Sequence, residues 1–139
     1  MMYSTNAQNQ STVDSVKIAV KQLFEAMRNN DSALLVNSFA DSAILQTITP
    51  KSDGAVVVKT ESISRFGSSV KHAEKGSWDE QAEINAVHID GPLASVWAPY
   101  RFFYKGNFSH CGANSIQLIR QQNGWKIQYL TDTRRRDCK

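Results

Sequence analysis

The amino-acid sequence predicts an α+β domain in which helices cover one face of an antiparallel sheet. Two observations lead to this prediction. The first half of the chain carries amphipathic helical patterns, whereas residues 78–136 form strand-like runs separated by turn signals. The order is helix, helix, short strand pair, helix and then four long strands, which keeps the helices apart from the main sheet. A length of 139 residues fits one domain with a sizeable core.

The first element is expected to be a helix with one apolar stripe, capped at its start by Ser11 or Thr12 and ended by Asn29-Asn30. The residues of the stripe recur at steps of three and four: Val13, Val16, Val20, Leu23, Phe24 and Met27. Residues 1–11 are polar and lack the apolar segment of a secretory signal, so we expect a disordered or poorly ordered lead. Residues 12–139 are then expected to form a single domain.

The middle of the chain predicts two shorter helices and a pair of short strands. Asp31 can cap a helix whose apolar residues are Leu34, Leu35, Val36 and Phe39. Residues 43–48 and 55–59 predict strands on either side of a Ser52-Asp53-Gly54 turn. Thr60 or Ser62 can cap a third helix that ends at Gly76, and Ile63, Phe66 and Val70 form its apolar side.

Three turn signals divide the last part of the chain into a four-stranded meander. They are Asp90-Gly91-Pro92, Gly106-Asn107 and Asn123-Gly124. Asn-Gly is the strongest of them, because a type I′ turn needs positive φ at both central residues. If the last two signals are two-residue loops, Lys105 pairs with Phe108 and Gln122 pairs with Trp125. Pro99 and Gly112 are the expected bulge sites.

This register divides the side chains of the meander between two faces. The core face is expected to carry Trp97, Arg101, Phe103, His110, Asn114, Ile116, Leu118, Trp125, Ile127, Tyr129, Thr131 and Thr133. The outer face is expected to carry Tyr100, Phe102, Tyr104, Cys111, Ser115, Gln117, Ile119, Lys126, Gln128, Leu130 and Asp132. No carboxylate of the last three strands then faces the core.

Composition and motifs exclude several classes of protein. The net charge is +3 and the pI is about 9.0, but part of the basic excess lies in Arg134-Arg135-Arg136 and Lys139, without a nucleic-acid-binding motif. No apolar run is long enough for a membrane span, so we expect no nucleic-acid or membrane partner and a cytoplasmic location. The sequence contains no zinc spacing and no nucleotide or flavin fingerprint, so no metal or cofactor is expected. Free thiols are the default for Cys111 and Cys138 in a cytosolic chain. The register also places Cys138 opposite Ser109, two residues from Cys111, so contact between the two thiols stays open if the last strand extends that far.

Several segments resemble the NTF2-like superfamily of cone-shaped domains. The segment Asn30-Asp31-Ser32-Ala33-Leu34 to Phe39-Ala40-Asp41-Ser42-Ala43 is similar to the entry of the second helix in that group. Three further segments look like an uncharacterised branch of SnoaL-like proteins and proteins labelled lumazine-binding: 96–102, 109–112 and 124–135. The resemblance covers residues 12–136 and implies an α+β cone of helices on a strongly curved sheet. Because this fold carries isomerases, dehydratases, cyclases and non-catalytic modules, it implies no single chemistry.

A cone of this kind is expected to bind a small, partly apolar molecule at its mouth. The predicted lining residues are Phe39, Phe66, Trp97, Arg101, His110, Asn114, Tyr129 and Thr131. His110 is the candidate general acid or base, because an imidazole takes both proton states near neutral pH. Two alternatives to simple binding stay open: a cofactor-free lyase or isomerase that uses His110 with Tyr129 or Asn114, and a non-catalytic dimerisation module. The resemblance agrees with a homodimer through an outer-face patch of Tyr100, Phe102, Tyr104, Ile119 and Leu130.

Overall fold

The computed structural model describes residues 9–138. Most of the segment predicted to be disordered, residues 1–8, lies outside the described residues, as does Lys139. The first helix already begins at Gln10, so the last residues of the predicted lead are helical.

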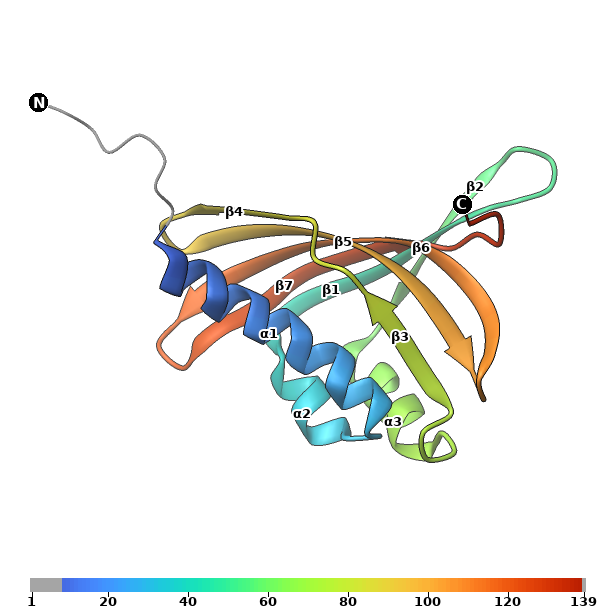
Figure 1. Ribbon diagram of the computed structural model, residues 1–139, viewed down its shortest axis with the longest axis horizontal. Coiled ribbons are helices and arrows are strands. Elements are labelled where there is room, and N and C mark those ends of the chain that lie inside the picture. The colour runs from blue at the N-terminus through green and yellow to red at the C-terminus, as the bar shows by residue number, and fades with distance from the viewer. Residues whose placement is uncertain (1–8, 139) are drawn as a thin grey trace, which may run out of the picture.

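Three helices lie together on one side of the sheet (Figure 1): α1 (Gln10–Arg28), α2 (Ser32–Asn37) and α3 (Ile63–His72). The predicted apolar stripe of α1 is buried, but the cap is Asn9, whose side chain accepts a hydrogen bond from the Ser11 amide at 2.9 Å. Asp31 and Ser62 cap α2 and α3. Gly67 of α3 allows a close approach to α2, because a Cβ there would lie 2.7 Å from a Val36 methyl.

Seven strands form one sheet in the order β2-β1-β7-β6-β5-β3, and β4 pairs with another part of β5. Their bounds are β1 (Phe39–Pro50), β2 (Val56–Glu61), β3 (Trp78–Ala82), β4 (Ala86–Asp90), β5 (Leu93–Tyr104), β6 (Asn107–Gln121) and β7 (Gly124–Thr133). The strands β4 to β7 form the predicted antiparallel meander, whereas β1 and β7 pair in parallel. The sheet curves around the helices, and the β1–β2 hairpin extends beyond them (Figure 1).

The core lies between the stripe of α1 and the concave face of the sheet. Its side chains with almost no exposed surface come from α1, α2, α3 and the strands β5, β6 and β7: Val16, Val20, Leu23, Leu35, Val70, Val96, Ile116, Leu118 and Ile127. These residues fill one end of the space under the sheet, so an open volume is left only toward the other end. The predicted α+β cone is therefore confirmed.

Two β-bulges change the register that the turn signals predicted. Phe103 pairs with Phe108 but Phe102 pairs with His110, so Ser109 is an extra residue in β6. Likewise Leu118 pairs with Ile127 but Gln117 pairs with Tyr129, so Gln128 is an extra residue in β7. Each bulge reverses the face of every side chain beyond it relative to the partner strand. The expected bulge sites at Pro99 and Gly112 were wrong, because both residues pair regularly.

The turns also differ from the prediction. Gln121 pairs with Gly124, so the last loop is Gln122-Asn123. Gly124 has a positive φ of 111° and Asn123 does not have a positive φ. The predicted type I′ turn at Asn123-Gly124 is therefore wrong, although the hairpin itself forms.

As a result, four of the five residues predicted to form an outer apolar patch face the concave side. Tyr100 is buried, and Phe102, Tyr104 and Leu130 line the cavity described below. The side chains that alternate with them face outward, as Trp97 does with 49% of its surface exposed. These four residues therefore do not form the predicted outer patch. The exposed apolar area on the outer face comes instead from residues such as Trp97 and Leu93.

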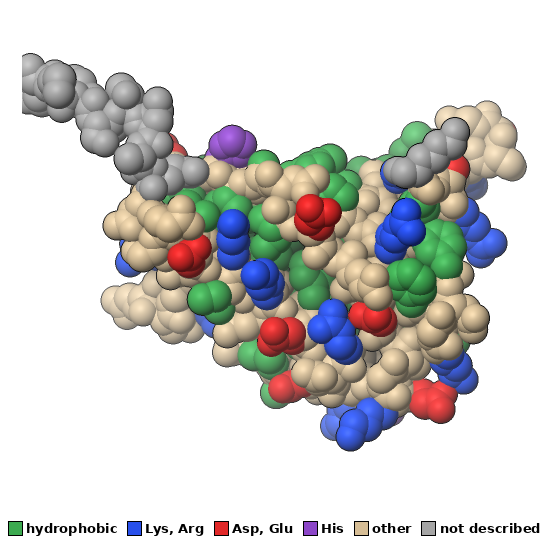
Figure 2. Space-filling view, in the orientation of Figure 1, with side chains coloured by type: hydrophobic (Ala, Val, Ile, Leu, Met, Phe, Trp, Pro, Cys, Tyr) green, Lys and Arg blue, Asp and Glu red, His purple; other side chains and the backbone are tan. Residues whose placement is uncertain are grey.

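The outer surface has no uniform charge on the face shown in Figure 2. Basic and acidic side chains alternate there over the helices and the neighbouring strands (Figure 2). Within residues 9–138, no helix is long and apolar enough to cross a membrane.

Candidate functional site

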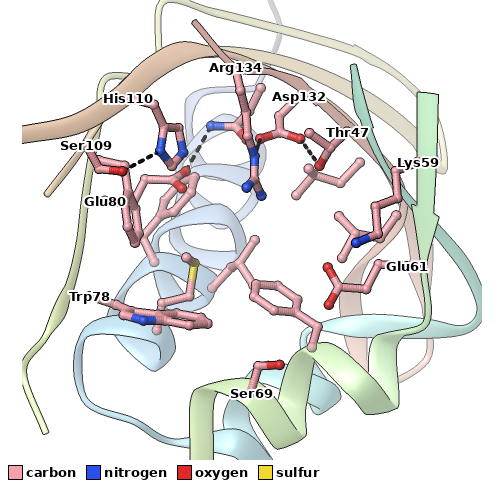
Figure 3. Close-up of a pocket in the computed structure, with 18 of the residues that line it drawn as sticks. Thr47, Lys59, Glu61, Ser69, Trp78, Glu80, Ser109, His110, Asp132 and Arg134 are labelled. Carbon is pink, nitrogen blue, oxygen red and sulfur yellow. Dashed lines mark hydrogen bonds and ion pairs between the residues drawn. The ribbon is translucent and has the colours of Figure 1, made fainter. Parts of the chain in front are cut away.

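A cavity of about 660 Å³ lies between the helices and the open end of the concave face (Figure 3). Its apolar part is formed by α1, α3 and four strands, through Leu23, Phe24, Met27, Leu45, Phe66, Trp78, Phe102 and Leu130. Trp78 and Phe102 meet edge to face with centroids 6.2 Å apart. Polar side chains gather opposite, mainly from β3, β6 and β7, so the cavity has an apolar body and one polar wall.

Glu80 and Asn114 are the most deeply buried polar pair of this wall. The Asn114 amide nitrogen donates to Glu80 Oε2 at 3.1 Å and to the Ala98 carbonyl at 3.2 Å. The second carboxyl oxygen of Glu80 has no hydrogen-bond partner among residues 9–138. Asn114 therefore fixes the Glu80 side chain and leaves one of its oxygens available to a molecule in the cavity.

Burial raises the pKa of Glu80 from its usual 4.5 to about 7. The hydrogen bond from Asn114 opposes this rise, the charge of Asp132 adds to it, and the charge of Arg134 reduces it. Both protonation states of Glu80 are consequently accessible near neutral pH, the condition in which a carboxyl group can both accept and donate a proton.

Asp132 is the second carboxylate of the wall, and two hydroxyl groups hold it. The Thr47 hydroxyl donates to Asp132 Oδ1 at 2.7 Å. The Tyr100 hydroxyl lies 3.2 Å from Asp132 Oδ2 and 2.7 Å from the Thr133 carbonyl oxygen, so its single proton serves one of them at a time. Burial and then the charges of Asp132 and Glu80 raise the pKa of Tyr100, which keeps this hydroxyl protonated.

His110 completes the wall beside Glu80 (Figure 3). Its ring stacks on Phe102 at a centroid distance of 4.9 Å, and its Nδ1 lies 3.0 Å from the Ser109 hydroxyl. Burial, followed by the charge of Arg134, lowers the pKa of His110 below 6.5. The imidazole is therefore mostly neutral at pH 7 and can act as a hydrogen-bond donor or acceptor.

The bulges divide the predicted lining residues between two faces. Three of the predicted lining residues, Phe66, His110 and Asn114, lie at the cavity. Phe39 packs edge to face on Phe66 at 6.4 Å but lines a second, shallower depression between α2 and α3. Four predicted lining residues lie outside the cavity, on the outer side of the sheet: Trp97, Arg101, Tyr129 and Thr131. The predicted placement of these four was wrong, and the ligand-binding role of the other residues stays a prediction.

Nothing in the sequence pointed to Glu80 or Tyr100 as residues of the site, and Asp132 was expected on the outer face. The expectation that no carboxylate of the last strands faces the core is wrong, because the bulge at Gln128 turns Asp132 inward. No local pattern marked Glu80, which lies in a short strand without apolar alternation. Asp132 could have been placed correctly only by anticipating the bulge at Gln128, since every residue beyond that bulge changes face.

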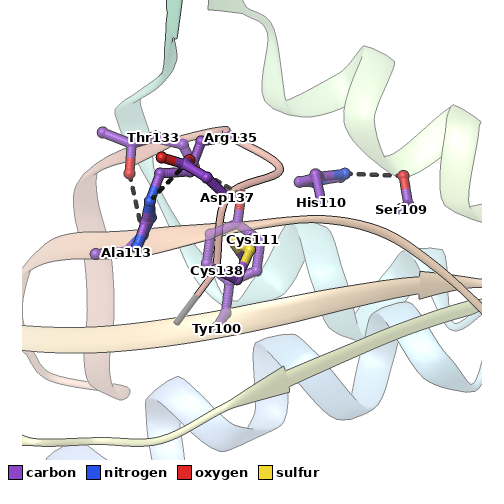
Figure 4. Close-up of a disulfide and its surroundings, with 9 residues drawn as sticks. All are labelled: Tyr100, Ser109, His110, Cys111, Ala113, Thr133, Arg135, Asp137 and Cys138. Atoms are coloured by element: carbon purple, nitrogen blue, oxygen red, sulfur yellow. Dashed lines mark hydrogen bonds and ion pairs between the residues drawn. A yellow bond between two sulfur atoms is a disulfide. The ribbon is translucent and has the colours of Figure 1, made fainter.

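The two cysteines form a disulfide bond, which corrects the prediction of free thiols. Cys111 of β6 joins Cys138, and the chain between β7 and Cys138 runs beside β6 (Figure 4). Backbone hydrogen bonds of 2.8 and 2.9 Å between Cys111 and Arg135 continue the sheet there. The disulfide and these two hydrogen bonds thus hold the backbone at the rim of the cavity, next to His110 and Arg134.

Within residues 9–138, no three histidine, cysteine or acidic side chains are close enough together to hold a metal ion. The polar wall offers one carboxyl group that titrates near neutral pH, one hydrogen-bonded carboxylate, a neutral imidazole and an arginine. Such a set can bind and orient a polar group of a ligand, and its carboxyl groups can move a proton.

Comparison with known proteins identifies the fold. No protein-family model matches the chain, and no curated protein matches its sequence. Solved structures do match. An NTF2-like protein of unknown function from Shewanella baltica superposes with a TM-score of 0.67 at 13% identity, over 94% of this chain and 98% of the other.

Two further structures agree in shape. A Streptomyces avermitilis protein described as a "putative dehydratase from the NTF2-like family" gives a TM-score of 0.67 at 17% identity, covering 92% and 99% of the two chains. A Nostoc punctiforme protein of unknown function with a cystatin-like fold gives 0.71 at 8% identity, covering 94% and 95%. Identities this low show the fold alone. The chain has the fold of the NTF2-like proteins.

Proposed function

We propose that this protein binds a small, partly apolar organic molecule in the cavity between its helices and its sheet. The observation that carries the proposal is the cavity itself, which has a volume of about 660 Å³, an apolar body and one polar wall. Small-molecule sites usually have volumes of about 300–1,000 Å³ and this division of apolar and polar groups. A cone filled by its own side chains, as a purely structural module requires, would leave no such volume.

A second candidate function is a cofactor-free lyase or isomerase, and the state of Glu80 supports it. A carboxyl group with a pKa of about 7 can take a proton from a carbon next to a carbonyl group and return it elsewhere. Tyr100 is a poor proton source because its hydroxyl is held by Asp132 and a backbone oxygen. Glu80 is therefore our proposed acid–base group.

His110, the sequence-based candidate for the acid–base group, becomes the proposed hydrogen-bonding partner of the ligand. Its predicted partner Asn114 shares the wall, whereas Tyr129 donates to Gln46 on the outer side of the sheet at 2.6 Å. Proton removal by Glu80 would leave negative charge on the ligand's carbonyl oxygen, and a neutral imidazole N–H could stabilise it. This reaction needs no redox partner, because one proton is removed from the ligand and one proton is returned to it, with no change of oxidation state.

A thermal-shift screen tests binding. It compares the wild type with His110→Ala and Glu80→Gln, and Glu83→Gln is the matched control for Glu80→Gln. Glu83 is an exposed glutamate three residues further along the chain. A ligand at 100 times its Kd adds about 2.7 kcal/mol to the free energy of unfolding. Stabilisation of the wild type by cyclic ketones or arene compounds, weakened in His110→Ala, supports the binding proposal. A broad library that stabilises nothing would leave the structural module as the better description.

Solvent deuterium exchange separates catalysis from binding. For a ketone that binds, NMR in D₂O follows loss of the hydrogen on the carbon next to the carbonyl group. Catalysis by Glu80 predicts rapid exchange with the wild type and with Glu83→Gln, but exchange at least about 100-fold slower with Glu80→Gln, even though the ketone still binds. Equal exchange rates would exclude Glu80 as the base.

A homodimer through the outer face of the sheet and the cellular location are also proposals. Exposed Trp97 and Leu93 could contribute apolar area to such a dimer. The sequence alone favoured the cytoplasm, but disulfides persist mainly in oxidising compartments. The Cys111–Cys138 bond therefore favours an oxidising environment over the cytosol.

A further inference from the structure

The geometry points to an organic anion as the ligand, with its oxyanion bound by Arg134 and its apolar body in the cavity. This inference rests on the proposed small-molecule function and names the chemical class of the ligand. Arg134 lines the cavity, and its guanidinium group points into it beside Asp132 (Figure 3).

The backbone fixes Arg134 in this position from both sides. Its amide donates to the Ile48 carbonyl at 3.1 Å, so residue 134 extends β7 along β1. On the other side, the next residue exchanges two hydrogen bonds with Cys111, and the Cys111–Cys138 disulfide closes the segment (Figure 4). The backbone at the end of a strand would otherwise fray, whereas the backbone of this segment is held at the rim. Preorganisation of this kind lowers the entropic cost of binding.

The guanidinium group has donors that the protein does not use. Its only ion pair within residues 9–138 joins Nε to Asp132 Oδ2 at 3.7 Å, which is longer than a hydrogen bond. Asp132 does not depend on this contact, because Thr47 donates to one oxygen and Tyr100 lies beside the other. The terminal nitrogens of Arg134 therefore remain free, and their planar fork matches a carboxylate.

The rest of the lining is compatible with an anion at this point. Lys59 and Glu61, both from β2, lie across the mouth and carry opposite charges. Glu80 carries only a partial negative charge at neutral pH. The positive and negative charges around the cavity thus nearly balance. The preference for an anion therefore comes from the unused donors of Arg134 and not from the net charge of the lining.

The apolar body of the ligand would lie against aromatic rings. Phe66, Trp78 and Phe102 line the same cavity as Arg134, and aromatic rings favour contact with a flat hydrocarbon skeleton. Asp132 is less suited to bind a cation, since both of its oxygens already have hydroxyl partners. An arene carboxylate combines both features that the cavity recognises.

The test compares 2-naphthoate with its neutral analogue 2-naphthamide by isothermal titration. The proteins are the disulfide-bonded wild type, Arg134→Gln and the matched control Arg135→Gln. Arg135 is the neighbouring arginine, whose side chain turns away from the cavity to Asp137 at 3.6 Å (Figure 4). Circular dichroism and the Tm of each variant show that the fold is retained.

We expect the wild type and Arg135→Gln to bind the carboxylate about tenfold or more tightly than the amide, because a charge-assisted hydrogen bond is about twice as strong as a neutral one. In Arg134→Gln this preference should disappear, with amide affinity almost unchanged. Equal affinities for both compounds in the wild type, or an equal loss in Arg135→Gln, would overturn the inference. Binding of neutral library compounds without binding of 2-naphthoate would overturn it too, while leaving the proposed function standing.

Discussion

Replacement of Glu80 by glutamine should remove a pH-dependent penalty from the stability of the folded protein. Glutamine has the same shape and can still accept the hydrogen bond from Asn114. It cannot ionise, so it does not place a negative charge in the buried wall. The prediction is that Glu80→Gln is more stable than the wild type at pH 8 and similar to it at pH 5.

The size of the effect follows from the pKa of Glu80. The unfolded chain loses this proton near pH 4.5, whereas the folded chain keeps it until about pH 7. Between these values the folded state binds more protons than the unfolded state, so stability falls as the pH rises. Each pH unit in this interval costs about 1.4 kcal/mol, so the full penalty is about 3.5 kcal/mol, of which about 2.5 kcal/mol develops between pH 5 and pH 8. Glu80 is only 8% exposed, so solvent screens this penalty little.

Urea unfolding at pH 5, 6, 7 and 8 measures the effect. Other groups also titrate in this range, so the relevant quantity is the difference in unfolding free energy between Glu80→Gln and the wild type at each pH. That difference should grow with pH, while the difference for exposed Glu83→Gln should stay nearly constant. Parallel stability profiles for the wild type and Glu80→Gln would show that the carboxyl group titrates normally and would refute the reasoning.

Three further perturbations test the fold around the site. Removal of the Cys111–Cys138 bond in a double alanine variant should cost about 3 kcal/mol in urea unfolding, because the bridge spans 27 residues; a reductant should lower the stability of the wild type alone, and equal sensitivity of the variant would count against a bridge. Gly112→Ala should destabilise by about 1–3 kcal/mol or more, since a Cβ would clash with the Thr133 carbonyl; an unchanged Tm would contradict this close approach. Leu118→Ala should cost about 2–5 kcal/mol, as this side chain is fully buried, and a loss below about 1 kcal/mol would place it outside the core.

Local patterns were sufficient to predict the helices and the hairpins. The stripe of α1 follows from its spacing, because residues three and four apart share a helix face whatever surrounds them. Asp31 and Ser62 cap their helices through their own side chains, which bond to amides three residues away. The turn at Gly91 likewise depends on nearby backbone conformation. Each of these interactions lies within a few residues, so the sequence contains it directly.

The candidate site could be predicted only in part, because its composition depends on strand register. Phe66 lies on a helix face, and His110 and Asn114 lie on the strand whose core face was assigned correctly. Asp132 and Tyr100 were assigned to the wrong face because single extra residues at Gln128 and Ser109 reverse the alternation of side chains. No residue type at these positions signals a bulge.

The sequence by itself determined the fold class, the order of the elements and the buried stripe of the first helix, because those follow from periodicity and short-range capping. Only the tertiary structure decided which polar groups meet in the cavity. The depth of Glu80, the inward direction of Arg134 and the bond between Cys111 and Cys138 each depend on segments far apart in the chain. Their proximity is set by how the curved sheet packs on the helices, and a two-residue alternation cannot encode this once a bulge has shifted it.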